Sequence, residues 1–319
     1  MADFVSRPIE RPVSFYHSEL NAMIYKNWTC QKCLLDCTCI RLDSFVETII
    51  FTWNHEAFVD AAIASWEDQE LDESSSLVVN DDASTDATLS QVLSRIGNTR
   101  RPITVISRIR NQYRESRFLF VLDLYGTSKA KYVAVLDGDD FWCSKDKLRL
   151  TTGALEAHPE ACLVFHDFFV PVRSIPLISI RNPSRQGAKK ISLASLVSEN
   201  PIGALTAVFR TNALPESIPE GFARLKIADL PIWCFLANRG DVIHLPKSMA
   251  VYRMHAHNYF ANLDKVSQHQ AHKQAIEYIL ENLPVPAAPL LPGRRLGKWS
   301  DRFMRLRLTP RLWLRTIRI

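Results

Sequence analysis

Residues 133–142 read VAVLDGDDFW, an apolar run that ends in an acidic cluster and two aromatic residues. The apolar run predicts a buried strand. Asp137, Asp139 and Asp140 follow it, although like charges a few Å apart repel one another. Two interpretations are open at this point. The cluster is either a solvated Asp-Gly turn, the more frequent meaning of so short a motif, or the site of a cation.

The composition of the chain is that of an ordinary globular protein. Of its 319 residues, 47% are hydrophobic and 23% are charged, which suits one large core and excludes a wholly disordered chain. No apolar run reaches about 18 residues, so no transmembrane helix is expected. The N-terminus lacks a signal-peptide pattern. We therefore expect a cytoplasmic protein with reduced cysteines, of which Cys143, Cys162 and Cys234 lie in apolar surroundings typical of a core.

Strand and helix patterns alternate from about residue 45 onward. Strands are predicted over 45–51, 76–80, 103–107, 131–136, 161–170, 204–209 and 241–245. Helices are predicted over 56–67, from 82 through 93, and over 116–124, 145–157, 228–238 and 267–283. This alternation predicts an α/β fold with a mostly parallel sheet, in which ligands bind at the carboxyl ends of strands. The acidic clusters at 80–82 and 137–140 would then share one crevice.

A divalent cation would explain the acidic cluster. Mg²⁺ and Mn²⁺ prefer oxygen ligands and commonly join one or two carboxylates to substrate phosphates. Asp137 and Asp139 are one residue apart in extended chain, so both side chains can point to the same side, and Gly138 leaves the backbone accessible. These residues predict a metal site that attracts the diphosphate of a nucleotide.

Four segments resemble, in the same order, the motifs of glycosyltransferase family 2, a family of inverting enzymes with the GT-A fold. They are FVETIIFTWNHEAFVDAAIASWEDQ, VVNDDASTDAT, VLDGDDFWCSKDKL and IADLPIWCFLANRGDVIHLPKSMAVYRMH. Together they span about Phe45–His257, roughly two thirds of the chain. The resemblance implies a Rossmann-like, mixed but mostly parallel sheet flanked by helices.

The resemblance also implies roles for individual residues. A nucleotide sugar would be bound by Thr52, Asn54, Asp81, Asp82, Asp137, Gly138 and Arg253. Asp82 would accept a hydrogen bond from an N–H group of the base, as a carboxylate can. The metal would be held by Asp139, Asp137 and His255. Asp229 would be the general base that deprotonates the acceptor hydroxyl.

Structural roles remain alternatives for several of these residues. Asp229 also fits the N-cap of a helix over 230–238, and Ser84 and Asp86 fit helix caps better than ligand contacts. Arg253 and His255 fit ordinary structural positions as well. Departures from the family pattern include Phe51, Trp53 and Ala228, and alanines stand at 83 and 87 where the family has glycines. The two alanines call the local turn geometry into question.

Two parts of the chain fall outside the resemblance. The spacing of Cys30, Cys33, Cys37 and Cys39 suits either reduced cysteines, which we favour, or a structural zinc site. From residue 294 to 319 there are nine Arg or Lys and one Asp, so this tail carries +8 and the remainder of the chain −3. A basic amphipathic helix with Trp299, Phe303 and Leu306 on it predicts an anchor on an anionic membrane surface. A helix packed on the main domain is the alternative.

Three regions follow from these patterns: an N-terminal Cys-containing extension (1–40), a GT-A domain (41–262), and a C-terminal helix with the basic tail (263–319). Residues 171–190 are predicted to form a mobile loop. Nucleic acid is not expected as a partner, because the body of the chain has no basic stripe.

The sequence thus predicts a metal-dependent inverting glycosyltransferase at the inner face of the plasma membrane. It would transfer a sugar from a UDP-sugar or similar donor to a saccharide or lipid-linked saccharide in surface polysaccharide synthesis. A sugar-nucleotide pyrophosphorylase is one alternative, but it needs a Gly-rich loop that FTWNHEAF lacks. An inactive sugar-nucleotide-binding scaffold is the other.

Overall fold

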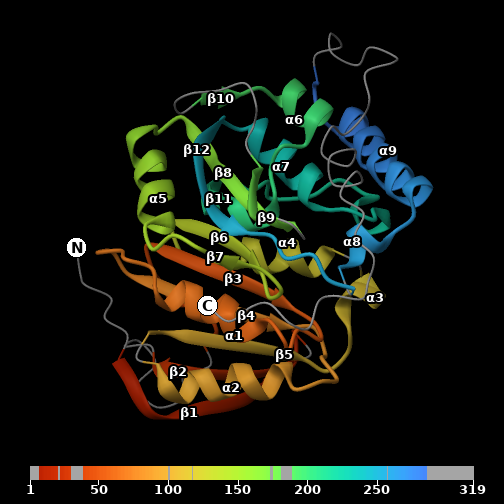
Figure 1. The fold of residues 1–319 in the computed structure, drawn as a ribbon. Coiled ribbons are helices and arrows are strands. Elements are labelled where there is room, and N and C mark those ends of the chain that lie inside the picture. Colours follow the sequence, from red (N-terminus) through yellow and green to blue (C-terminus); the bar gives the residue numbers. More distant parts are fainter. Residues whose placement is uncertain are drawn as a thin grey trace.

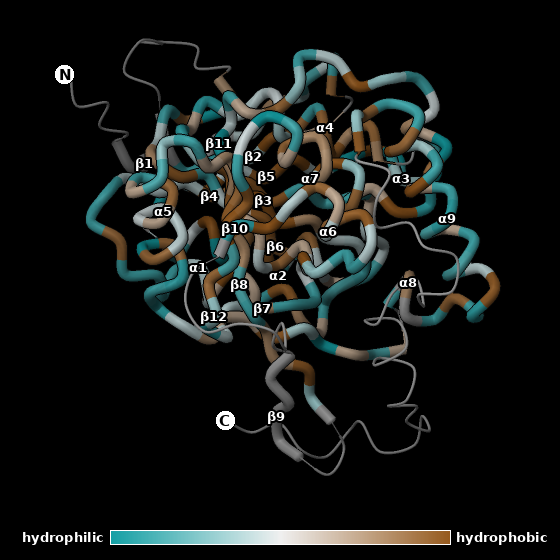
Figure 2. Tube along the Cα trace, turned by 90° about the horizontal axis from the view of Figure 1, so that it is seen from above, coloured by the Kyte–Doolittle hydropathy of each residue, from teal (hydrophilic) through white to brown (hydrophobic). Residues whose placement is uncertain are grey.

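The computed structural model describes residues 7–20, 22–29, 39–99, 101–116, 118–172, 175–180, 189–256 and 258–285. A single mixed sheet runs through them in the order β1-β2-β5-β4-β3-β6-β11-β8-β12-β10 (Figure 1). Hydrophobic segments gather along the central strands, and hydrophilic ones lie toward the periphery (Figure 2).

The centre of the sheet is parallel, as predicted. It consists of β5 (Ile103–Arg108), β4 (Ser75–Asp81), β3 (Val46–Thr52) and β6 (Tyr132–Asp137), each paired in parallel with its neighbour. These strands are buried almost throughout, as expected of parallel strands covered on both faces.

Helices cover both faces of this sheet. Val46 and Ile50 pack with residues of α1 (Val59–Glu67), α2 (Thr88–Asn98) and α5 (Lys147–Ala157). Ile49, between them on the strand, packs instead with residues of α4 (Leu119–Gly126), α6 (Leu193–Glu199) and α7 (Asp229–Ala237). Alternate strand residues therefore enter opposite cores. The helix predicted over 116–124 corresponds to α4, which begins at Leu119, and the separate short helix α3 (Gln112–Ser116) before it was not predicted.

The C-terminal half makes the sheet mixed. Its strands are β7 (Phe141–Trp142), β8 (Ala161–Val172), β9 (Ile175–Ile180), β10 (Lys189–Ile191), β11 (Val208–Arg210) and β12 (Asp241–Val251). Strand β11 pairs antiparallel with both β6 and β8, while β8 and β12 are parallel. Short 3-10 helices lie at Ala204–Thr206, Thr211–Ala213 and Phe222–Arg224, and α8 (Tyr259–Asn262) and α9 (Lys265–Asn282) close the described chain.

Three predicted elements need correction here. The strand predicted over 204–209 is a 3-10 turn followed by β11, since Thr206 N donates to Gly203 O. The strand predicted over 241–245 continues to Val251, because the register shift between Leu245 and Ser248 accommodates Pro246. The loop predicted over 171–190 contains β9 and the start of β10, while residues 173–174 and 181–188 lie outside the described residues.

An N-terminal hairpin extends the sheet beyond β5. Its strands β1 (Arg7–His17) and β2 (Ala22–Thr29) pair antiparallel, and β2 pairs antiparallel with β5. Residues 1–40 show no clear periodicity, so these strands were not predicted. A charged residue interrupts the inward face of β2: Lys26 is fully buried, and its Nζ donates to Cys39 O at 2.8 Å.

No helix in the described part of the chain is both long and apolar enough to cross a membrane. The basic tail (294–319) lies outside the described residues.

Candidate active site

The carboxyl ends of three central strands bring both acidic clusters to one edge of the sheet. In the strand register, Thr52 of β3 stands opposite Asp81 of β4, and Phe51 stands opposite Asp137 of β6. Main-chain hydrogen bonds hold the ends together. Asp82 N donates to Thr52 O at 2.9 Å, and Gly138 N donates to Phe51 O at 2.7 Å. The two acidic clusters therefore lie together at one edge of the sheet, as predicted, while a crevice between them stays a prediction.

Gly138 is required by a close approach between two loops. A Cβ on this residue would lie 2.8 Å from Thr52 Oγ1 and 2.9 Å from His55 Nδ1. Atoms at such distances overlap, and both neighbours are held in place: Thr52 is buried, and His55 N donates to Thr88 Oγ1 at 2.7 Å. The glycine thus lets the chain after β6 pass directly beside the chain after β3.

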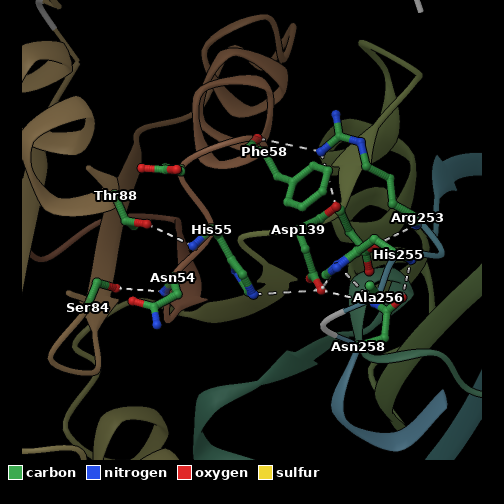
Figure 3. Close-up of polar contacts among 12 residues, drawn as sticks. Asn54, His55, Phe58, Ser84, Thr88, Asp139, Arg253, His255, Ala256 and Asn258 are labelled. Carbon is green, nitrogen blue, oxygen red and sulfur yellow. Dashed lines mark hydrogen bonds and ion pairs between the residues drawn. The ribbon is translucent and has the colours of Figure 1, made fainter. Parts of the chain in front are cut away.

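Three nitrogen atoms converge on one carboxylate oxygen of Asp139 (Figure 3). The distances to Asp139 Oδ2 are 2.9 Å from His255 Nε2, 3.2 Å from Asn258 Nδ2 and 3.8 Å from His55 Nε2. Burial acts to raise the pKa of Asp139, but the hydrogen bond from His255 and the charges of His55 and His255 outweigh it. The pKa of Asp139 therefore lies below its ordinary value, and this carboxylate is ionised at neutral pH.

The neighbouring aspartates have the opposite tendency. Burial, together with the charges of Asp139 and Asp229, raises the pKa of Asp137 to about 7. Asp140 is buried and accepts a hydrogen bond from Arg253 N at 2.8 Å. Burial, followed by the charges of Asp139 and Asp137, holds the pKa of Asp140 well above its ordinary value. Asp140 therefore ionises less readily than an exposed aspartate, and the charges of Asp137 and Asp139 repel each other.

Asp229 belongs to the same electrostatic site. It is the first residue of α7, whose N-cap is Ala228 and not, as the alternative interpretation had it, Asp229. Burial raises the pKa of Asp229, and the main-chain N–H of Leu230 only partly offsets this effect. The charge of Asp229 in turn raises the pKa of Asp137, so the two carboxyl groups share one region.

Arg253 contacts the loop after β6 and the residues before α1. Its Nη1 donates to Asp139 O at 3.1 Å, and its guanidinium lies 4.5 Å from the centroid of the Phe141 ring and 5.4 Å from that of Phe58. The structure therefore brings Arg253 beside the acidic cluster, through the main chain of Asp139. Its contact with a diphosphate stays a prediction.

Asn54 ties the loop after β3 to the loop after β4. It has a left-handed backbone with φ 54°, its N–H donates to Ser84 Oγ at 2.9 Å, and its Oδ1 accepts from Thr85 N at 2.8 Å. Ser84 thus accepts a hydrogen bond from Asn54, and its prediction as a helix cap is wrong. Asp86 Oδ1 accepts from the N–H of Thr88, the first residue of α2, although the N-cap residue of this helix is Ala87.

The two aspartates after β4 have different environments. Asp82 accepts from Gln112 N at 2.6 Å and from Tyr113 N at 3.1 Å, so both its oxygens hold the first turn of α3. Asp81 accepts from Ser84 N, while its Oδ1 is buried without a hydrogen-bond partner. Burial raises the pKa of both carboxyl groups. The base contact predicted for Asp82 is untested, and Asp81 has the available acceptor.

The donor set fits a divalent cation that shares its coordination with a substrate. Within the described residues, no group of three or more His, Cys, Asp or Glu side chains is arranged to hold a metal alone. Asp139 and His255 offer an adjacent carboxylate and imidazole, with Asp137 nearby. Mg²⁺ and Mn²⁺ are commonly bound in this way, by one or two protein ligands together with substrate phosphates.

The sequence patterns did not predict a functional role for three residues of the site, His55, Asn258 and Trp53. His55 and Asn258 approach Asp139 from segments that precede and follow it by many residues, and local patterns carry no signal of such contacts. Trp53 was noted only as a departure. It is 43% exposed at the end of β3, and the Arg114 guanidinium lies 5.9 Å from its ring centroid.

The cysteine predictions are only partly covered by the structure. Cys30, Cys33 and Cys37 lie outside the described residues, so the zinc site stays a prediction without support. Cys162 and Cys234 are buried, as expected of core residues. Cys143 is exposed, which corrects its predicted place in the core.

Comparison with known proteins agrees with this geometry. The family model described as glycosyl transferase family 2 matches residues 48–211, about half of the chain. Uncharacterized proteins of Mycobacterium bovis and Mycobacterium tuberculosis are 28% identical over 219 residues, which cover 66% of this chain. The match covers 58% of the length of those relatives.

Two solved structures share the fold. S. aureus TarS 1–349 in complex with UDP-GlcNAc has a TM-score of 0.56 and 17% identity, covering 76% of this chain and 68% of TarS 1–349. The mannosyltransferase PcManGT from Pyrobaculum calidifontis, in complex with GDP-Man and Mn²⁺, has a TM-score of 0.55 and 17% identity, covering 77% of this chain and 66% of its own. Family match, sheet topology and acidic strand ends agree: the chain belongs to glycosyl transferase family 2 and has the GT-A fold.

Proposed function

We propose that this enzyme transfers a sugar, with inversion, from a nucleotide-diphosphate sugar to a hydroxyl group of a saccharide or lipid-linked saccharide. One observation carries the proposal, the grouping of acidic side chains at the strand ends. His255 contacts Asp139 there, and the charges of Asp139 and Asp229 both act on Asp137. A UDP-sugar is the default donor. In support, TarS has been crystallised with UDP-GlcNAc and PcManGT with GDP-Man and Mn²⁺.

The nucleotide base would bind between the ends of β3 and β4. Trp53 presents an exposed aromatic face there, and bases stack on such faces whatever their sequence. The buried Oδ1 of Asp81 would accept the imide N–H of a uracil. Thr52 and Gly138 would form the floor of the site, where side-chain bulk is excluded by their close approach.

The diphosphate would lie over the acidic cluster. Asp139 and His255, assisted by Asp137, would hold a divalent cation there, and a cation so placed stabilises the negative charge of a departing diphosphate. Arg253 is fixed beside the cluster and adds positive charge at the same end of the site. These groups would orient the donor so that its anomeric carbon is open to attack.

The chemical step is a displacement at the anomeric carbon. The acceptor oxygen forms the new bond to this carbon, while the bond from the carbon to the diphosphate oxygen breaks and the nucleoside diphosphate leaves. Asp229 takes the proton of the acceptor hydroxyl. Burial suits it for this role, because its raised pKa makes it a stronger base than an exposed aspartate.

A donor screen tests the proposal. Release of nucleoside diphosphate is measured across UDP-, GDP- and other sugar nucleotides with Mn²⁺, with Mg²⁺ and with EDTA. We expect release from one donor class, dependent on the cation. Release that EDTA leaves unchanged would contradict the metal role, and donor binding without release would favour an inactive scaffold.

The acceptor and cellular location form a second part of the proposal. A lipid-linked acceptor would suit a cytoplasmic enzyme at the inner face of the plasma membrane, attached through the basic tail (294–319). The test is flotation with vesicles containing anionic lipid, for the full chain and for a chain that ends at residue 293. Equal flotation of the two would reject the tail as an anchor.

A further inference from the structure

Asn258 lies at the start of a helix but does not cap it. It is the N-cap residue of α8, where an asparagine side chain ordinarily accepts a hydrogen bond from a first-turn N–H, and no such bond is formed. The side chain turns instead toward the acidic cluster (Figure 3) and is buried, with 5% exposure. Because this buried amide does not cap the helix, its hydrogen bonds must be made to other groups.

The two ends of this amide bind two different residues of the site. Asn258 Oδ1 accepts from His255 N at 2.5 Å, and Nδ2 donates to Asp139 Oδ2 at 3.2 Å. Asp139 follows β6 and His255 follows β12, so they come from strands far apart in the chain. One side chain therefore joins the two segments that carry the carboxylate and the imidazole.

The amide nitrogen of Asn258 lies near both residues of the pair. Nδ2 lies 3.1 Å from His255 Nε2 as well as 3.2 Å from Asp139 Oδ2. An amide nitrogen only donates, so it can support the carboxylate whether Nε2 carries a hydrogen or presents a lone pair. The hydrogen bond from Asn258 to Asp139 therefore does not depend on which tautomer His255 adopts.

We infer that Asn258 is a positioning residue that holds Asp139 and His255 as a preformed ligand pair for a divalent cation. The inference rests on the proposed function and extends it to a residue that lies beyond the matched family segment (48–211). Groups that orient metal ligands in this way typically change metal affinity by about ten- to a hundredfold when removed. A residue that only stabilised the loop would change the melting temperature and leave that affinity unchanged.

Asn262 supplies a matched control. It belongs to the same short helix, and its Nδ2 donates to Ala256 O at 2.5 Å, so it also binds the loop after β12. Its side chain is exposed and makes no hydrogen bond to the acidic cluster among the described residues. Asn262→Ala therefore removes a similar loop contact without touching Asp139 or His255.

The test measures binding of Mn²⁺ to the full chain in the presence of UDP, from the electron paramagnetic resonance signal of free Mn²⁺ during titration, with a titration of UDP without protein as the blank. We expect Asn258→Ala to raise the dissociation constant about ten- to a hundredfold and Asn262→Ala to leave it within about twofold. Unchanged affinity in a folded Asn258→Ala variant would overturn the inference alone. A wild-type chain that binds no Mn²⁺ even with UDP present would overturn the metal part of the proposed function and the inference with it.

A second variant keeps the inference testable if Asn258→Ala fails to fold. Asn258→Asp retains the acceptor for His255 N but replaces the donor to Asp139 with a negative charge. The two carboxylates then repel each other, and a bound cation relieves the repulsion. We expect Mn²⁺ to raise the melting temperature of this variant by more than that of the wild type. Equal shifts would show that residue 258 does not face the cation-binding carboxylate.

Discussion

Gly138 and Thr52 lie so close together that a Cβ on residue 138 would stand 2.8 Å from Thr52 Oγ1. This contact joins the loop after β6 to the end of β3, the two strands that carry the centre of the site. Any side chain at 138 must therefore move Thr52, and with it the neighbouring His55.

The first prediction concerns this contact. Gly138→Ala should weaken binding of UDP in the presence of Mn²⁺ by about tenfold, or about 1.4 kcal/mol, because the added Cβ displaces Thr52 and His55 from the floor of the site. Isothermal titration calorimetry measures the effect. Gly153→Ala is the control: a Cβ there meets nothing within 4 Å, and alanine in an exposed helix adds about 0.5–1 kcal/mol of stability. Equal affinity of wild type and Gly138→Ala would contradict the proposed floor of the site.

The second prediction concerns the turn after β4. Ala83 has a φ of 62°, in the left-handed region where an L-residue with a Cβ is strained by about 1–2 kcal/mol. Ala83→Gly should therefore raise the free energy of unfolding by about 1 kcal/mol, measured by urea denaturation. Ala61→Gly, inside α1, should lower it by about 0.5–1 kcal/mol. If both Ala83→Gly and Ala61→Gly lower the free energy of unfolding, the turn at Ala83 is not strained.

The third prediction concerns the general base. Asp229→Asn should reduce turnover about 10²- to 10⁴-fold, the usual contribution of a general base, while donor affinity stays near that of the wild type. Because burial raises the pKa of Asp229, the acid limb of the wild-type rate profile should lie above the ordinary aspartate value of about 4. Retained turnover in the variant would reject the assignment.

Asp229→Asn, which lowers turnover, should at the same time make the folded protein more stable at high pH. A carboxyl group whose pKa is raised by folding favours the folded state at pH values below its unfolded pKa, and this contribution is lost as the pH rises through the folded pKa. The ionised Asp229 therefore costs stability at pH 8. Asp229→Asn should raise the melting temperature at pH 8, and the gain should shrink toward pH 4. A loss of stability at pH 8 would indicate that Asp229 has a stabilising partner.

The fourth prediction concerns the N-terminal hairpin. Asn27 on β2 is buried; its Nδ2 donates to Thr99 O and Arg101 O, and its Oδ1 accepts from Ile103 N. Asn27→Ala would leave these main-chain groups without a partner, at a cost of about 1–3 kcal/mol for each one that water cannot reach.

A matched control separates this role from the general effect of removing an asparagine. Asn98 is exposed and donates only to Ser94 O, so Asn98→Ala should change stability by less than about 0.5 kcal/mol. Urea denaturation of both variants measures the difference. Equal effects would mean that the hairpin is an appendage, and would support a domain boundary near residue 40.

The sequence predicted the parts of the fold that depend on local periodicity. The apolar runs of β3, β4 and β6 and the acidic residues after them are visible in the chain itself, and parallel pairing then brings Asp81 and Asp137 to one edge. The hairpin was missed because Lys26 occupies an inward position on β2, where its charge interrupts the apolar alternation.

The side-chain contacts of the site could not be predicted in the same way. Asn54 and Asp82 were expected at the nucleotide, yet their oxygens accept main-chain N–H groups of Thr85, Gln112 and Tyr113. His55 and Asn258 reach Asp139 only because the sheet places three distant segments together. Such contacts depend on the packed geometry, about which neighbouring residues in the sequence carry no information.

The central claim is that the acidic residues after β6 bind a divalent cation together with the diphosphate of the donor. A crystal grown with Mn²⁺ and UDP, with anomalous scattering to locate the manganese, tests it most directly. We expect one manganese ion in contact with Asp139 and His255 and with the oxygens of the diphosphate. Manganese and diphosphate bound away from Asp139 would contradict the account.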